Sequence, residues 1–385
     1  QRQMCIRDSY TASLATAKTQ LNANVAEINK SFTSLDKGFD ATMKVGQNCF
    51  KTIATASGVA AAAITAAAAA SIVAGSNFES AFAGVKKTVD ATEEEYAMLR
   101  QNILDMSKEI PSSASEIANV MEIAGQLGIA TDSLTEFTKV MINLGVSTNL
   151  SAEDAATALA KFANVVSMPD FDENGISNYE RLGSVIVDLG NNFATTEQDI
   201  VTMATRLAST GDIVGLSEAQ IMALATAMSS VGIEAEAGGS TMSKLLRKIQ
   251  LAVETGSSSL QDYASVANMT GEEFSQVFKD DAVVALSAFI DGLNDTERNG
   301  KSAVAILDDM DIKEIRLTNT ILALANASGV MSNAIDTANK AWDENTALAI
   351  EAGKRYETVE SKMQIMKNAF VDLGISAYED LREPL

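Results

Sequence analysis

Apolar residues recur at intervals of three and four along most of the chain, the period expected for amphipathic helices. The pattern is clearest over residues 113–166 and residues 195–253, and each stretch predicts three short helices in succession. Ser113 with Glu116, and Thr195 with Gln198, predict capping boxes at the starts of the two stretches. Since no convincing run of alternating β-branched residues is present, the sequence predicts an all-α fold.

Glycines and polar caps divide each stretch into its helices. Gly128 and Gly145 are predicted to end the first and second helices of the earlier trio, and Gly232 to end the second helix of the later one. Gly238-Gly239 is predicted to lead into the last helix. Further helix starts are predicted by N-cap residues, namely Thr92, Ser151, Ser217 and Thr270.

The two trios match position by position. Leu134 aligns with Ile221 and Phe137 with Leu224, at an offset of 87 residues that also relates their third helices. The pattern favours a duplicated helical unit that forms a compact body. The alternative is a chance likeness between two amphipathic trios.

Heptad-like seams lie on both sides of this body. Apolar residues spaced alternately by four and three predict coiled-coil-like helices in residues 10–51 and at the end of residues 294–385. The first seam is Leu21, Val25, Ile28, Phe32, Leu35 and Phe39, and the second is Tyr356, Val359, Met363, Met366, Phe370 and Leu373. An ordinary surface helix is the alternative over so few heptads.

Residues 52–77 form an uncharged, alanine-rich segment that predicts a hydrophobic helix. Between Ile53 and Gly75, 12 of 23 residues are alanine. The segment is long enough to span a bilayer, but few of its residues strongly favour the bilayer centre. A buried or self-packing helix is therefore preferred, and a membrane span is the alternative.

Composition narrows the range of functions. The 385 residues carry a net charge of -22, and a surface of that sign repels nucleic acid rather than binding it. The chain has no histidine and only Cys5 and Cys49, so the commonest catalytic and zinc-binding patterns are missing. We expect no enzyme activity and no cofactor. Residues 1–9 differ in character from the rest of the chain and are interpreted as non-native sequence.

One acidic loop resembles a calcium site without completing it. Asp170, Asp172 and Asn174 fall at the first, third and fifth loop positions, but the expected final glutamate, Glu180, comes one place early. The bidentate ligand would be misplaced, so we expect a surface loop without a metal. The carboxylates of Asp308, Asp309 and Asp311 are likewise interpreted as a solvated acidic turn.

Several long strings in residues 78–293 resemble the conserved domain of phage tail tape-measure proteins, in the phage tail minor-protein family. They include EIPSSASEIANVMEIAGQLGI from Glu109 and LGVSTNLSAEDAATALAKFANV from Leu144. RLGSVIVDLGNNFATTEQDIVTMATRLA from Arg181 and LSEAQIMALATAMSSVGIEAEAGGSTMSKLL from Leu216 follow in the same order. The resemblance is to the conserved N-terminal region of such proteins and implies that the chain is a fragment.

The resemblance implies a structural protein of a bacteriophage or prophage tail, which sets tail length during assembly and assists genome delivery. It implies production in the host bacterial cytoplasm and a final location in the tail tube lumen. The implied partners are tail tube and tail assembly proteins, tail-tip or baseplate proteins and other copies of the chain, without specific nucleic-acid binding. Contact with the host membrane during infection is a hypothesis motivated by the uncharged segment.

Two questions stay open at the level of sequence. A membrane-active, pore-forming helical protein that uses residues 52–77 is the alternative function. In addition, a ruler must be extended whereas the trios predict a compact body, so the body is either a module on a rod or rearranges within the tube.

Overall fold

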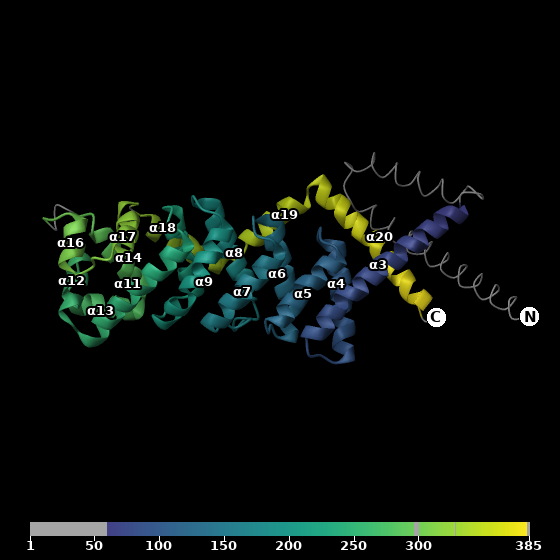
Figure 1. Ribbon diagram of the computed structural model, residues 1–385, viewed down its shortest axis with the longest axis horizontal. Helices are drawn as coiled ribbons and strands as arrows, with labels where there is room; N and C mark the ends of the chain where they lie inside the picture. Colours follow the sequence, from purple (N-terminus) through teal and green to yellow (C-terminus); the bar gives the residue numbers. More distant parts are fainter. Residues whose placement is uncertain (1–59, 296–299, 328, 383–385) are drawn as a thin grey trace, which may run out of the picture. The chain divides into compact units, whose positions relative to one another are not determined.

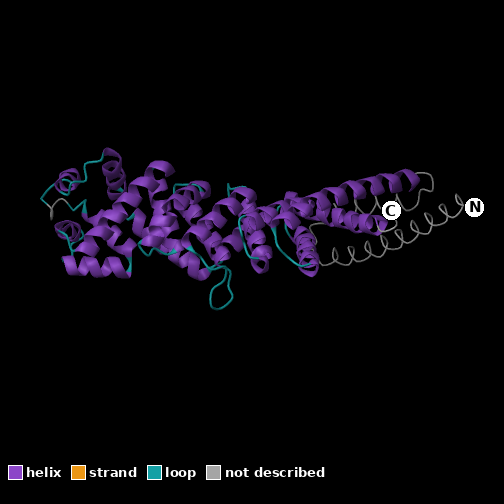
Figure 2. Ribbon diagram, turned by 60° about the horizontal axis from the view of Figure 1, so that its bottom comes forward, coloured by secondary structure: helices purple, strands orange, loops and turns teal. Residues whose placement is uncertain are grey.

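The structure, a computed structural model, describes residues 60–295, 300–327 and 329–382. The predicted all-α class is confirmed, because the described chain folds into helices joined by short loops (Figure 2). The helices, in order, are α3 (Ala60–Thr88), α4 (Glu93–Glu109), α5 (Ala114–Gln126), the 3-10 turn η2 (Thr131–Ser133), α6 (Leu134–Ser147), α7 (Ala152–Val166), α8 (Asn178–Asn192), α9 (Glu197–Ile213), α10 (Glu218–Ser230), α11 (Ala235–Thr255), α12 (Ser258–Val266), α13 (Gly271–Asp280), α14 (Ala282–Gly292), α16 (Ala303–Asp309), α17 (Ile315–Asn326), α18 (Val330–Glu344), α19 (Ala347–Tyr356) and α20 (Val359–Arg382).

Two compact units make up the chain. Among the described residues, the first unit contains residues 60–87, 92–119 and 359–382, so α20 joins α4 although most of the chain separates them. The second unit contains residues 88–91 and 120–358 and holds the helices from η2 to α19. The domain boundaries predicted from the sequence stay predictions, and the boundary after residue 77 falls within the continuous helix α3.

The second unit is built from neighbouring helices that bury apolar stripes against one another. In the earlier trio α6 packs on α7, whereas in the later trio α9 packs on both α10 and α11. The predicted stripe residues are buried at the centre, including Phe137, Met141, Leu224 and Met228 at 0% exposure. Each predicted repeat range therefore contains three helices, and their origin by duplication stays a prediction.

The last helices of the second unit return along the earlier ones. Helix α18 packs on α8 and α10. Helix α19 packs on α8 and α6, and the labels of these three helices lie close together in Figure 1. Ser184 in α8 donates a hydrogen bond to Asn345 at 3.1 Å, across 161 residues of sequence. Helix α19 thus covers the face of α6 that carries Asn143, whose side chain accepts a hydrogen bond from the Tyr356 hydroxyl.

Most predicted helix caps are confirmed, and one is wrong. Ser113 and Glu116 exchange capping bonds, and Thr92, Ser151, Ser217 and Thr270 cap α4, α7, α10 and α13. The box at Thr195 with Gln198 is shifted by one residue, because Thr196 accepts the bond from the Asp199 amide. Thr195 instead lies 2.6 Å from the Ser229 hydroxyl in α10, a tertiary contact that competes with the local cap.

Two predicted glycine breaks are also wrong. Helix α6 continues through Gly145 to Ser147, and Gly238-Gly239 lies within α11. Gly238 and Gly239 permit close helix packing. A Cβ atom added at Gly238 would lie 2.7 Å from the Met203 Cε atom, and one added at Gly239 would lie 2.7 Å from the Arg206 Cβ atom. The expected left-handed helix ends do occur at Gly128 and Gly232, with φ of 85° and 79°.

Of the two predicted terminal seams, only the second lies within the described residues. The seam from Leu21 to Phe39, with all of residues 10–51, lies outside the described residues, as do residues 1–9 and 52–59. The seam from Tyr356 is not on one helix, because Tyr356 ends α19 and α20 begins at Val359. No helix among residues 60–295, 300–327 and 329–382 combines the length and the apolarity needed to cross a membrane.

Candidate functional site

The acidic loop between α7 and α8 is organised by its own hydrogen bonds. The Asp170 carboxylate accepts a bond from the Ser133 hydroxyl at 2.5 Å and another from the Tyr179 hydroxyl at 3.1 Å. An isolated antiparallel bridge between Phe171 and Ser177 closes the loop. Both Asp170 oxygens are therefore occupied by protein donors that fix the loop to η2 and α8.

Asp172 is satisfied in the same way. One carboxylate oxygen accepts from the backbone amides of Asn174 and Ile176, at 2.8 and 2.9 Å. The other accepts from Arg181 at 2.7 Å. The bond from the Ile176 amide, followed by the Asn174 amide and Arg181, holds the pKa of Asp172 below its usual value against the opposing effect of burial.

Glu180, the last residue of the calcium-loop pattern, also binds a protein group. Glu180 lies in the first turn of α8, where its carboxylate accepts from Asn345 at 3.2 Å. Arg181 occupies the twelfth loop position and supplies a positive charge where a calcium site needs a bidentate carboxylate. Within the described part of the chain, no group of three or more histidine, cysteine or acidic residues is arranged to hold a metal ion.

Adding calcium to the purified chain should leave its thermal unfolding midpoint unchanged. A ligand stabilises a fold only if it binds the native state, and here the carboxylate oxygens of Asp170 and Asp172 already accept protein hydrogen bonds. The measurement is a thermal scan by circular dichroism with calcium or with a chelator. A midpoint that rises with calcium concentration would contradict this interpretation.

Arg181 is the residue of this region that sequence reasoning missed. Besides binding Asp172, its guanidinium donates to the Trp342 carbonyl at 3.1 Å and lies 6.0 Å from the Trp342 ring centroid. It therefore joins the loop, α8 and α18, which are far apart in sequence. No local pattern could reveal this role, since the loop motif only marked Arg181 as a misplaced residue.

The acidic turn at Asp308, Asp309 and Asp311 shows no feature of a catalytic site. Lys301 pairs with Asp309, and Lys313 pairs with Asp311 at 3.1 Å. The Asp311 side chain is 87% exposed, so its charge is solvated and pairs of this kind contribute little to stability. The cluster matches the solvated turn expected from its sequence.

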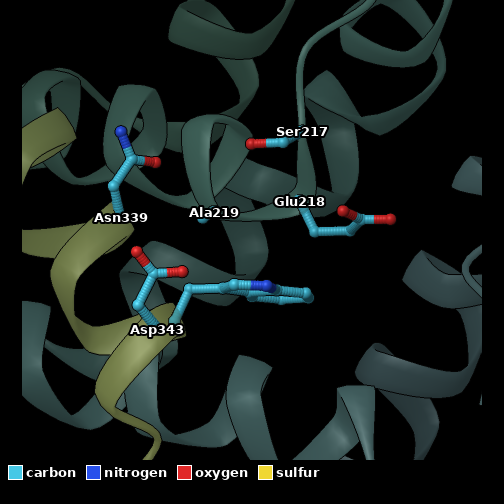
Figure 3. A pocket seen from close by; sticks show the side chains of 6 residues that line it. Ser217, Glu218, Ala219, Asn339 and Asp343 are labelled. Carbon is cyan, nitrogen blue, oxygen red and sulfur yellow. The ribbon is translucent and has the colours of Figure 1, made fainter. Parts of the chain in front are cut away.

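A shallow hollow lies between the start of α10 and the end of α18 (Figure 3). Its polar side chains are those of Ser217, Glu218, Asn339 and Asp343, and Trp342 forms one wall. Ser217 is already engaged in the α10 capping box, and the lining supplies two carboxylates without a basic group.

A buried polar cluster of the first unit joins α4 and α20. Asn368 is 3% exposed, and its side-chain amide donates toward the carbonyls of Ser107 and Ser112 at 2.9 and 2.7 Å. Its own oxygen accepts from Gln364 at 2.8 Å. Nearby, Lys108 binds Asp372 at 3.5 Å, and burial raises the pKa of the Asp372 carboxyl against the pull of that lysine.

This cluster reverses the expectation drawn from the terminal seam. The predicted seam residues Val359 and Met363 are 69% and 51% exposed, whereas the polar residue Asn368 is buried. Sequence reasoning therefore missed Asn368 because it looked for an apolar contact face. The only signal in the sequence was the run of Gln364, Asn368 and Asp372 at intervals of one helical turn.

Comparison with known proteins gives this fold its context. The family described as phage-related minor tail protein matches residues 100–318, more than half of the chain. The chain belongs to this family. The match runs from α4 into α17 and therefore includes both helical trios and the acidic loop.

Two curated relatives of this chain are both described as probable tape measure proteins. A probable tape measure protein of Clostridium phage phiCD119 is 22% identical over 362 residues, covering 88% of this chain and 35% of the relative. A probable tape measure protein of Halomonas phage phiHAP-1 is 26% identical over 192 residues, covering 46% of this chain and 22% of the relative. The chain thus spans about a third or less of these relatives. No solved structure matches it significantly.

Proposed function

We propose that this chain is part of a tape-measure protein, a structural component of a phage or prophage tail that sets tail length and assists genome delivery. The observation that carries the proposal is the alignment of 88% of the chain with a relative described as a probable tape measure protein. The family membership of residues 100–318 supports it. The proposed partners are tail tube and tail assembly proteins, tail-tip or baseplate proteins and further copies of the chain.

Elementary physics supports the proposed role. A helix rises about 1.5 Å per residue, so an extended helical chain converts residue number into length. The net charge of -22 disfavours adhesion to DNA that passes through the same tube lumen, which is the proposed location.

Deleting Leu21–Ser34 in frame from the parent phage should shorten the tail by about 21 Å, or by one tube ring if length is quantised. These residues carry two repeats of the predicted N-terminal seam, which is expected to be rod. Tail length is measured by electron microscopy of purified particles.

A matched control separates length from sequence. Replacing the same residues with an unrelated helical segment of equal length should leave tail length unchanged. Unchanged tails after the deletion, with lost infectivity, would move this arm from measuring to delivery. Unchanged tails with normal infectivity would remove both roles from the arm.

A further inference from the structure

The chain leaves the first unit and re-enters it at the same place. The Asn368 side-chain amide is 2.7 Å from the Ser112 carbonyl, although 256 residues separate them in sequence. The same amide lies 2.9 Å from the Ser107 carbonyl and 3.4 Å from that of Ile110. Three carbonyls around the end of α4 thus converge on one side chain of α20.

This contact satisfies groups that a helix end leaves unpaired. The last carbonyls of a helix have no partner within the helix, and burying them without one costs free energy. Asn368 supplies the donors from α20, and Gln364 in turn satisfies the oxygen of Asn368. The buried amide therefore has both of its functions occupied, and α20 acts as a cap on the end of α4.

A charge pair repeats the connection beside it. Lys108, in the last turn of α4, binds Asp105 of its own helix at 2.7 Å and Asp372 of α20 at 3.5 Å. A lysine near a helix C-terminus also interacts favourably with the helix dipole. Helix α20 is thus fixed to α4 by two independent polar contacts one helical turn apart.

The consequence concerns length. A continuous helix of 256 residues would be about 380 Å long. Here the chain makes that excursion through α5 to α19 and returns to within hydrogen-bonding distance of its starting point. While the contact is closed, residues 113–367 add nothing to the distance that the chain covers between α4 and α20.

We propose that residues 113–367 are carried in the assembled tail as a closed module that the ruler does not count, with Asn368 as the closing residue. This inference rests on the proposed tape-measure function. It resolves the conflict between a compact body and an extended ruler in favour of a module attached to a rod, with the counted residues outside the module.

Cross-linking in purified tails tests the closed state directly. Lys108→Cys and Asp372→Cys are introduced into the full-length protein after its native cysteines, Cys49 among them, are replaced by serine. The two new thiols then lie across the α4–α20 contact. A short bifunctional maleimide should join them and create a looped chain with altered mobility on a denaturing gel. Mass spectrometry of the linked peptides identifies the product.

A second pair controls for thiol access within the tail. The control carries Gln101→Cys and Asp105→Cys, two positions one turn apart on α4. In the native protein the Gln101 Nε2 atom lies 3.0 Å from the Asp105 Oδ1 atom. This pair should cross-link whether the module is closed or extended. Efficient reaction of both pairs supports the proposal, whereas reaction of the control pair alone overturns it.

Tail length provides the second measurement. Replacing residues 113–367 by a short glycine–serine loop should leave tail length unchanged if the module is not counted. Shortening by about 380 Å would overturn the inference. If no tails assemble, the cross-linking result decides. The deletion of Leu21–Ser34 tests the proposed function separately. A ruler should give shorter tails after that deletion whether or not residues 113–367 are counted, so the inference can fail while the proposed function holds.

Discussion

Replacing Phe137 by alanine should lower the free energy of unfolding of the second unit by about 4 kcal/mol. Phe137 lies in α6 with 0% exposure, and its ring packs edge-on against Tyr179 of α8 with centroids 4.7 Å apart. Truncation removes apolar contact and leaves a cavity that the surrounding helices fill incompletely. The Tyr179 hydroxyl binds Asp170, so the loss should also loosen the acidic loop.

Urea denaturation followed by tryptophan fluorescence measures this effect. The chain has a single tryptophan, Trp342, in α18 of the second unit, and it therefore reports on that unit. Phe171→Ala is the matched control, because Phe171 is 39% exposed on the acidic loop and its loss should cost less than about 0.5 kcal/mol. Equal losses at the two positions would contradict the packing described for α6.

Phe137 also illustrates what the sequence predicts well. It belongs to a stripe with Leu134 and Met141 at helical spacing, and all three are fully buried. The stripe predicts which face of the helix is inside because burial of apolar area is the dominant stabilising term and needs only local spacing to be recognised. Capping residues such as Ser217 are predicted for the same reason, since a cap is a contact within three residues.

The contacts that organise the tertiary structure lie beyond this local information. Ser184 binds Asn345 and also accepts a bond from the Leu348 amide at 3.4 Å, and these partners lie on a return segment more than 160 residues later. Ser184 and Asn345 are small polar residues and Leu348 takes part through its backbone amide, so hydrophobic periodicity does not mark these contacts. Thr195 shows the same limit, because its contact with Ser229 shifts the α9 cap by one residue.

For the acidic loop, the sequence predicts that no metal binds, and this stays a prediction. The early position of Glu180 indicated that the set of calcium ligands is incomplete. The structure shows that Arg181, at the twelfth loop position, binds the Asp172 carboxylate. The closing contact at Asn368 could not be predicted, because hydrophobic spacing directs attention to Val359 and Met363 on the exposed side of α20. The polar run of Gln364, Asn368 and Asp372 is the periodic signal of this face, but a polar run also fits a solvated face, so only the fold reveals the contact.

Replacing Gly145 by valine should lower the free energy of unfolding of the second unit by about 3 kcal/mol. A Cβ atom at this position would lie 2.8 Å from the backbone nitrogen of Ala152 and 3.0 Å from its Cβ atom. Backbone cannot yield as the end of a flexible side chain can, so α6 and α7 must move apart. Urea denaturation with Trp342 fluorescence measures the loss.

Glycines without such a neighbour serve as controls. Gly353 in α19 has no atom within 4 Å of an added Cβ atom, so Gly353→Ala should raise stability by up to about 1 kcal/mol through helix propensity. A gain of similar size for Gly145→Ala would show that α7 does not approach α6 this closely.

Asparagine separates crowding from backbone strain. Gly232, the position that aligns with Gly145 in the later trio, has φ of 79° and open space around it. Gly232→Asn should therefore be tolerated much better than Gly232→Val, because asparagine adopts the left-handed conformation at low cost. At Gly145 asparagine should be nearly as damaging as valine, since the obstacle is the Ala152 backbone and not the conformation of the residue. Rescue by asparagine at Gly145 would restore the original prediction that this glycine ends the helix.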